Sequence, residues 1–167
     1  MIYILAGDIR TGKTTAVLNW VNTRNDVDGW LCPDNENGKR CFLNVKSQNR
    51  FELEVEVENE LEVDMAKIVS IGPFNFLRSA FKKANDYLMS LTSENENQYI
   101  IIDELGRLEL NKEGLHTAAE DLISKFLNAD NQHLILVVRS YLLDDIIAFY
   151  NISKYQVLAK GDLSSLV

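Results

Sequence analysis

One stretch decides the fold of this chain: Gly7-Asp8-Ile9-Arg10-Thr11-Gly12-Lys13-Thr14-Thr15. It fits the pattern G-x-x-x-x-G-K-[ST], and an apolar run of strand length, residues 1–6, comes directly before it. Residues 16–21 follow with the apolar spacing of a helix face, and we expect that helix to cover residues 13–24. Strand, glycine-rich loop and helix are the context in which this pattern predicts a phosphate-binding loop.

The chemistry of the loop is specific. Its glycines let backbone N–H groups point inward at a phosphate chain, and the start of the following helix adds partial positive charge. Lys13 would bring a full charge to the β- and γ-phosphates of a nucleotide, and the Thr14 hydroxyl would hold Mg²⁺. All nine residues are therefore candidate nucleotide-binding residues. The alternative, a Gly- and Thr-rich turn with a surface lysine, is disfavoured by the strand and helix on either side.

Length and composition predict one globular domain. The chain has 167 residues, 46% of them apolar and 25% charged, which suits a single domain over residues 1–167. The formal net charge is −8, so nucleic acid is not an expected partner, because non-specific binding to it needs a basic surface.

Nothing in the sequence indicates a membrane or an export route. No apolar run has the length of a membrane span, and the strand-like start at Met1 leaves no room for a leader peptide. Cys32 and Cys41 are too few for a disulfide scaffold or a zinc site. We therefore expect a cytoplasmic protein.

An antiparallel meander is expected at about residues 29–71. The pattern predicts a turn at residues 25–29, then a hairpin between a short strand at residues 30–32 and a second strand at residues 39–45. Residues 51–58 alternate strictly between apolar residues and glutamate, which predicts one half-buried strand with a solvated face of Glu52, Glu54, Glu56 and Glu58. A further short strand is expected at residues 67–71.

The second half of the chain alternates helices and strands. The expected strands cover residues 99–103, 134–138 and 155–158. The expected helices cover apolar stripes at residues 76–91, 113–127 and 142–150. Asn75 and Ser140 are candidate N-caps, and residues 92–98 form a polar loop. This order predicts an α/β fold with a mostly parallel central sheet, into which the meander is inserted.

Two acids follow the buried strand at residues 99–103. An apolar strand that ends in aspartate, here Asp103, is typical of the carboxylate that supports Mg²⁺ beside a phosphate-binding loop. Glu104 comes next and would position or deprotonate the water that attacks a γ-phosphate. The alternative is a pair of acids that cap a loop. The Gly7–Thr15 motif favours the functional interpretation.

The sequence around these acids resembles a known family. The octet Asp103-Glu104-Leu105-Gly106-Arg107-Leu108-Glu109-Leu110 is similar to D-E-[IL]-G-x-[ML]-E-L, a signature of small P-loop nucleoside-triphosphatases. That family is described as cancer-related or thermophile-type, and as nucleotide-kinase-related. Further similarities are the G-K-T-T end of the loop, Gly29-Trp30-Leu31-Cys32-Pro33, Gly38-Lys39-Arg40, Phe42 and Val137-Val138-Arg139.

The resemblance implies a RecA-like three-layer fold and Mg²⁺-dependent hydrolysis of ATP, GTP and related nucleoside triphosphates. It implies that Lys13 and Thr14 bind phosphate and Mg²⁺, that Asp103 supports the metal and that Glu104 is the base. Arg139 would sense or stabilise the γ-phosphate, or it is a surface arginine after a strand.

The chain departs from the family pattern in two places. Ile9-Arg10 stands where the family usually has Pro-Gly, so the Arg10 guanidinium either stabilises charge beside the phosphates or points to solvent. The last strand is followed by Ala159-Lys160-Gly161-Asp162, where the family has an Asn-Arg-Asp-like turn. Nearby, Arg107 could reach a phosphate or an acidic neighbour, and Glu109 is expected to form a salt bridge with Arg107 or Lys112.

Two other functions fit the same motifs. A nucleotide or small-molecule kinase uses the same phosphate cradle, although no arginine-rich lid is evident. A nucleotide-dependent switch or assembly module would hydrolyse slowly and contact an unidentified protein partner, with the acidic meander as the candidate contact face.

Overall fold

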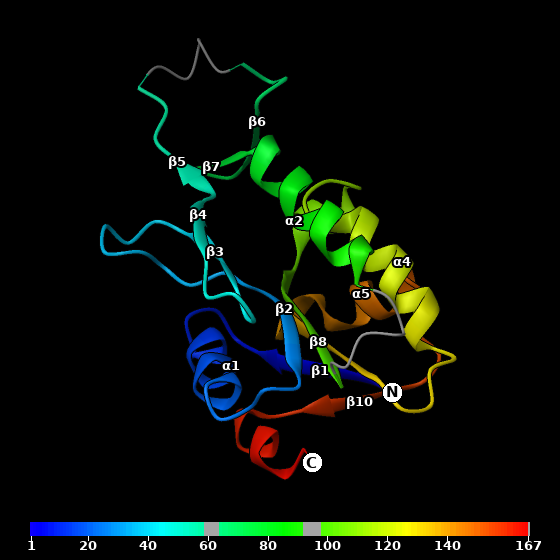
Figure 1. The fold of residues 1–167 in the computed structure, drawn as a ribbon. Helices are drawn as coiled ribbons and strands as arrows, with labels where there is room; N and C mark the ends of the chain where they lie inside the picture. Colours follow the sequence, from blue (N-terminus) through cyan, green and yellow to red (C-terminus); the bar gives the residue numbers. More distant parts are fainter. Residues whose placement is uncertain (59–63, 92–97, 167) are drawn as a thin grey trace.

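The computed structural model describes residues 1–58, 64–91 and 98–166. A seven-stranded sheet carries the fold, in the order β10-β1-β9-β8-β2-β3-β4 (Figure 1). Its strands are β1 (Ile2–Gly7), β2 (Val27–Leu31), β3 (Cys41–Asn44), β4 (Arg50–Glu52), β8 (Tyr99–Leu105), β9 (His133–Arg139) and β10 (Tyr155–Leu158). The five strands from β10 to β2 are parallel to one another, and β3 and β4 are antiparallel.

Helices cover both faces of the sheet. α1 (Lys13–Val21) and the 3₁₀ helix η3 (Lys160–Ser165) pack on one face, while α2 (Arg78–Ser90), α4 (His116–Phe126) and α5 (Leu143–Phe149) pack on the other (Figure 1). Each face has its own hydrophobic cluster, because β1, β8 and β9 are apolar at nearly every position and are buried on both sides. The predicted three-layer α/β fold with a mostly parallel sheet is therefore confirmed.

The turn predicted at residues 25–29 was wrong for residues 27–29, because residues 27–31 form β2. This strand includes most of the strand predicted at residues 30–32; it pairs in parallel with β8 in the central sheet and antiparallel with β3. The acid in this strand, Asp28, made the segment resemble a turn. In the fold Asp28 is buried and accepts hydrogen bonds from the Tyr87 hydroxyl at 2.9 Å and from the Gly29 N–H at 2.7 Å.

The meander exists, but it is divided between two sheets. β3 pairs antiparallel with β2, as expected for the predicted hairpin. The strand predicted at residues 51–58 is broken after Glu52, and β5 (Glu54–Val55) joins β7 (Phe74–Leu77) and β6 (Ile68–Ile71) in a separate three-stranded sheet. Glu54 is buried rather than solvated, and its carboxylate accepts a hydrogen bond from the Arg40 N–H at 3.1 Å. Residues 59–63 lie outside the described part of the chain.

Two predicted helix caps were also wrong. α2 begins only at Arg78, so Asn75 cannot cap it. Asn75 lies within β7, and its side chain accepts a hydrogen bond from the Ser70 hydroxyl. Ser140 opens a short 3₁₀ helix, η2 (Ser140–Leu142), and the N-cap position of α5 is Leu142. The polar loop predicted at residues 92–98 lies outside the described residues except for Gln98. In the described residues, no helix combines the length and apolar character needed to cross a bilayer.

Candidate functional site

The site is assembled at one edge of the central sheet. β1, β8 and β9 are neighbours and run in parallel, so the segments that follow them emerge at the same edge. Gly7 is in register with Arg139, and Asp103 is in register with Val137. The fold thus brings together the three sequence segments that carried the predicted site residues.

The predicted phosphate-binding loop turns tightly before α1. Gly12 has φ 79° and Arg10 has φ 56°, both in the left-handed region. Residues 8–12 are exposed, whereas Lys13 is buried. The Lys13 ammonium folds back over the loop and donates to the carbonyl oxygens of Gly7 at 2.8 Å and Asp8 at 2.7 Å. Desolvation lowers the pKa of Lys13, and the charges of Glu104 and Asp103 oppose that shift.

Asp103 joins the loop directly. Its carboxylate accepts hydrogen bonds from the Thr14 hydroxyl at 2.9 Å and from the Cys32 N–H at 3.1 Å. Burial raises the pKa of Asp103 to about 6, although both hydrogen bonds favour the ionised form. The Cys32 contact was not foreseen from the sequence, because it depends on β2 lying beside β8.

Glu104 and Arg139 form an ion pair. The Arg139 Nε donates to the Glu104 Oε1 at 2.7 Å, and both side chains are largely shielded from solvent. The β8–β9 register shifts between Asp103 and Leu105, where the peptide bond between Asp103 and Glu104 is cis. Arg139 is therefore not a free surface arginine: it contacts the carboxylate predicted to be the base.

Comparison with known proteins identifies the family and the fold of the chain. The model of a protein family described as NTPase matches residues 2–160, nearly the whole chain. The chain belongs to this NTPase family. No curated protein matches it in sequence.

Solved structures with the fold of the NTPase family are similar in shape but distant in sequence. THEP1 from the hyperthermophile Aquifex aeolicus aligns with a TM-score of 0.71 at 14% identity, over 100% of this chain and 97% of the other. A human cancer-related nucleoside triphosphatase aligns with a TM-score of 0.67 at 17% identity, over 99% and 94% of the two chains. The family resemblance inferred from the Asp103–Leu110 octet is thereby confirmed.

The expected salt bridge of Glu109 is absent from the described residues. Glu109 is buried, and its carboxylate accepts hydrogen bonds from the N–H groups of Gly106 at 2.8 Å and Leu115 at 2.9 Å. Gly114 makes this approach possible, because a Cβ there would lie 2.2 Å from the Glu109 Oε1. Arg107 instead lies over the Tyr141 ring, 5.7 Å from its centroid. In this chain, the second glutamate of the octet thus supports the segment that leads from the site to α4.

The C-terminal turn reaches the loop as well. The Lys160 Nζ donates to the Thr11 carbonyl oxygen at 2.5 Å, and the Asp162 carboxylate accepts from the Ala159 N–H at 2.7 Å. The sequence pattern had left this turn without a role. Its place follows from the pairing of β10 with β1, which sets the two following segments side by side.

The donors at the site suit Mg²⁺. A hydroxyl and a carboxylate, Thr14 and Asp103, are oxygen ligands of the kind that Mg²⁺ uses together with phosphate oxygens and water. Among the described residues there is no cluster of three or more His, Cys, Asp or Glu side chains that could form an all-protein metal cage. The site therefore fits a metal that enters with a phosphate ligand.

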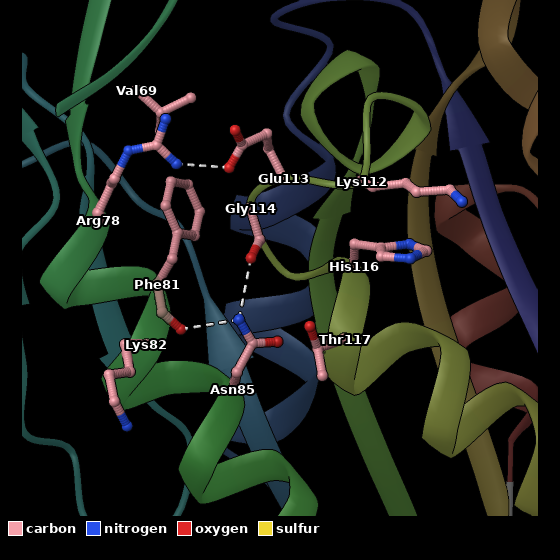
Figure 2. Close-up of a pocket in the computed structure, with 10 residues that line it drawn as sticks. All are labelled: Val69, Arg78, Phe81, Lys82, Asn85, Lys112, Glu113, Gly114, His116 and Thr117. Carbon is pink, nitrogen blue, oxygen red and sulfur yellow. Dashed lines mark hydrogen bonds and ion pairs between the residues drawn. The ribbon is translucent and has the colours of Figure 1, made fainter. Parts of the chain in front are cut away.

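A separate pocket lies between α2 and the start of α4 (Figure 2). Arg78 pairs with Glu113 at 2.6 Å across it, and the Asn85 side chain donates to the carbonyl oxygens of Phe81 and Gly114, each at 2.9 Å. Among the described residues that line this pocket, none comes from residues 7–15 or is one of the two acids after β8. These contacts join α2 to the segment that leads into α4, so we assign the pocket a structural role.

Proposed function

We propose that this protein is a Mg²⁺-dependent nucleoside-triphosphatase that hydrolyses ATP, GTP and related nucleoside triphosphates to the diphosphate and phosphate. One observation carries the proposal: the Thr14 hydroxyl and the Asp103 carboxylate are joined at 2.9 Å, with Glu104 as the next residue. Membership of an NTPase family supports it. The human relative's description as a nucleoside triphosphatase points the same way.

The loop and two oxygen donors would bind the substrate. Backbone N–H groups of residues 7–15 and the Lys13 ammonium would hold the β- and γ-phosphates, once Lys13 exchanges its loop carbonyls for phosphate oxygens. Thr14 and Asp103 would hold Mg²⁺, which when bound supplies positive charge against the phosphate oxygens.

Glu104 and Arg139 would serve the chemical step. Water attacks the γ-phosphorus in line, the bond from that phosphorus to the β–γ bridging oxygen breaks, and the proton lost by water passes to the Glu104 carboxylate. Arg139 already lies at Glu104 and would stabilise the charge that develops on the γ-phosphate.

Phosphate release from a panel of nucleoside triphosphates, with and without Mg²⁺, tests the proposal. Glu104→Gln should keep triphosphate binding and lose turnover by at least about 100-fold, because the amide cannot accept the proton. Lys13→Ala should lose triphosphate binding itself. Wild-type turnover by Glu104→Gln would remove Glu104 from the base role, and transfer to an added nucleoside or nucleoside monophosphate would indicate a kinase instead.

A further inference from the structure

The C-terminal turn holds a lysine against the phosphate-binding loop. Leu5 of β1 is in register with Leu158 of β10, so the loop and η3 leave the sheet side by side. Lys160, the first residue of η3, donates from its Nζ to the Thr11 carbonyl oxygen at 2.5 Å. This contact places a cation at the carbonyl group that directly precedes Gly12.

The turn that carries Lys160 is itself fixed in place. The Asp162 carboxylate accepts a hydrogen bond from the Ala159 N–H at 2.7 Å, at the start of η3. Leu163 is buried in the hydrophobic cluster that also contains Val17 of α1, and η3 lies next to α1 (Figure 1). The backbone of Lys160 is therefore supported from below, while its exposed side chain reaches the loop.

The Thr11 carbonyl belongs to the same peptide unit as the Gly12 N–H. This unit is trans and planar, so its C=O and its N–H point in opposite directions. Because the carbonyl oxygen points to Lys160 in η3, the Gly12 N–H points away from η3. In the sheet, β10 lies on one side of β1, and the strands that end in Arg139 and lead to Asp103 lie on the other side.

The local sequence does not fix the direction of this peptide unit. Glycine tolerates both signs of φ, and a Cβ at Gly12 would have no atom within 4 Å, so the unit can rotate there without a clash. Within residues 1–58, 64–91 and 98–166, the Gly12 N–H forms no hydrogen bond that would hold it. The contact between Lys160 and the Thr11 carbonyl oxygen supplies the missing constraint.

The direction of the Gly12 N–H matters for an anionic ligand. A phosphate-binding loop holds its ligand through backbone N–H groups that converge on it. A cation on the carbonyl oxygen also polarises the peptide, which makes its N–H a stronger donor. Lys13 cannot take over this task, because it is assigned to the phosphates and would leave the loop carbonyls when it binds them.

We propose that Lys160 is a positioning residue for the phosphate-binding loop: it holds the Thr11–Gly12 peptide so that the Gly12 N–H is presented to the phosphate chain. This inference rests on the proposed function. It assigns to the C-terminal turn control over the geometry of the loop. Lys160 acts through the Thr11 carbonyl, and not by contact with the nucleotide.

This peptide unit can be observed by itself. Thr11-Gly12 is the only Thr-Gly pair in the sequence, so protein labelled with carbonyl-¹³C threonine and ¹⁵N glycine gives a single carbonyl–nitrogen correlation in NMR spectra. A hydrogen bond to the oxygen deshields a carbonyl carbon. Lys160→Ala should therefore move the Thr11 carbonyl ¹³C signal upfield. Lys160→Arg, which keeps a cationic donor, should leave it near its wild-type position.

Lys154→Ala is the matched control. It removes an exposed lysine directly before β10, at the opposite end of the strand from Lys160, so it should not move the Thr11 signal. The other glycine signals in the same samples show whether each variant is folded.

Nucleotide binding measures the consequence for the site. Lys160→Ala should raise the Kd of a non-hydrolysable ATP analogue with Mg²⁺ about 5- to 10-fold, the scale of one charge-assisted hydrogen bond at an exposed site. KM for triphosphate hydrolysis should rise by the same factor while kcat stays within about twofold, because the N–H binds substrate and transition state alike. Lys160→Arg and Lys154→Ala should resemble wild type.

Two results would overturn the inference. An unmoved Thr11 carbonyl signal in Lys160→Ala would mean that Lys160 does not hold the peptide. A moved signal with unchanged affinity would mean that the contact does not position the loop for phosphate. If wild type binds no triphosphate, the proposed function fails, and an unmoved signal then refutes the role of Lys160 separately, because that measurement needs no ligand.

Discussion

Arg10 occupies a backbone conformation that suits glycine. Its φ of 56° is left-handed, which costs an L-residue about 1–2 kcal/mol relative to the right-handed region. The resembled family usually has Pro-Gly where this chain has Ile9-Arg10, and the observed φ gives the physical reason for glycine at the second position. In this chain an arginine holds a backbone conformation that glycine adopts without strain.

Arg10→Gly should raise the free energy of unfolding by about 1 kcal/mol, because glycine adopts a left-handed φ without a steric penalty. Part of that gain is offset, because glycine loses more conformational entropy on folding than arginine does. Urea denaturation measures the change. Arg10→Ala is the control: it removes the guanidinium but keeps the Cβ, so it should give no gain. An equal gain from both variants would mean that the charge, and not the backbone, causes the effect.

Glu109 makes folding sensitive to pH. Burial raises its pKa to about 7 from an ordinary value of 4.5, despite backbone hydrogen bonds from Leu115, Gly106 and Glu109 itself that favour the ionised form. A raised folded-state pKa means that the folded protein binds the proton more tightly. The stability that this proton contributes is complete below pH 4.5 and is lost as pH rises through 7.

The difference in unfolding free energy between wild type and Glu109→Gln should therefore change with pH. As pH rises from 4.5 to 7, the free energy of unfolding of wild type should fall relative to that of Glu109→Gln, by up to about 1.4 kcal/mol per pH unit. Asp103 is present in both proteins, so its own pKa shift cancels. Glu120→Gln, at an exposed site, controls for the loss of one carboxylate, and a flat difference curve for Glu109→Gln would refute the assignment.

At the scale of elements, β2 links the meander to the site. It lies between β8 and β3, and its C-terminal end delivers the Cys32 N–H to Asp103. Gly29 permits this pairing: its φ is 120°, and a Cβ at Gly29 would lie 2.2 Å from the Ile101 carbonyl oxygen on β8. That neighbour is backbone, so it cannot move aside as a flexible side chain would.

Gly29→Ala should lower the free energy of unfolding by about 3 kcal/mol or more, from overpacking and the left-handed backbone together. Gly38→Ala is the matched control, since Gly38 has φ 70° but no atom within 4 Å of its Cβ position. It should lower stability by about 1 kcal/mol, the backbone term alone. Similar losses in urea titrations of the two variants would contradict the close approach of β2 to β8.

For the whole molecule, the net charge is negative, although two cationic side chains lie at the candidate site. The chain carries −8, yet Lys13 and Arg139 lie at the same sheet edge and come from two separate segments, since Gly7 is in register with Arg139. A local group of cations suits a compact anion such as a triphosphate. It does not form the extended basic surface that a nucleic acid requires.

Binding of a labelled 20-nucleotide DNA strand, followed by fluorescence anisotropy, should remain weaker than about 10⁻⁴ M in Kd at physiological salt. The reason is that the −8 net charge repels a polyanion beyond the site. Addition of a saturating triphosphate should not improve DNA binding. Micromolar affinity that falls with salt would show a basic surface that the charge count does not indicate.

The sequence alone determined the features that local pattern encodes. The spacing of Gly7, Gly12 and Lys13 defines a phosphate loop, because a tight turn needs residues that tolerate positive φ, as Gly12 shows at 79°. The apolar runs of β8 and β9 predicted buried parallel strands, since burial on both faces removes alternation. Both signals lie within about ten residues, where neighbours in sequence are neighbours in space.

The tertiary structure decided everything that depends on distant residues. The contact of Cys32 with Asp103 spans 71 residues, that of Thr14 with Asp103 spans 89, and that of Lys160 with Thr11 spans 149. The sequence pattern placed Asp28 in a turn and Glu54 on a solvated face, because an acid is costly to bury without partners. In the fold both are buried, and their partners Tyr87 and Arg40 come from distant parts of the sequence. The sequence thus determined which candidate site residues the chain carries, and the packing of β2, β8 and β9 decided which of them meet.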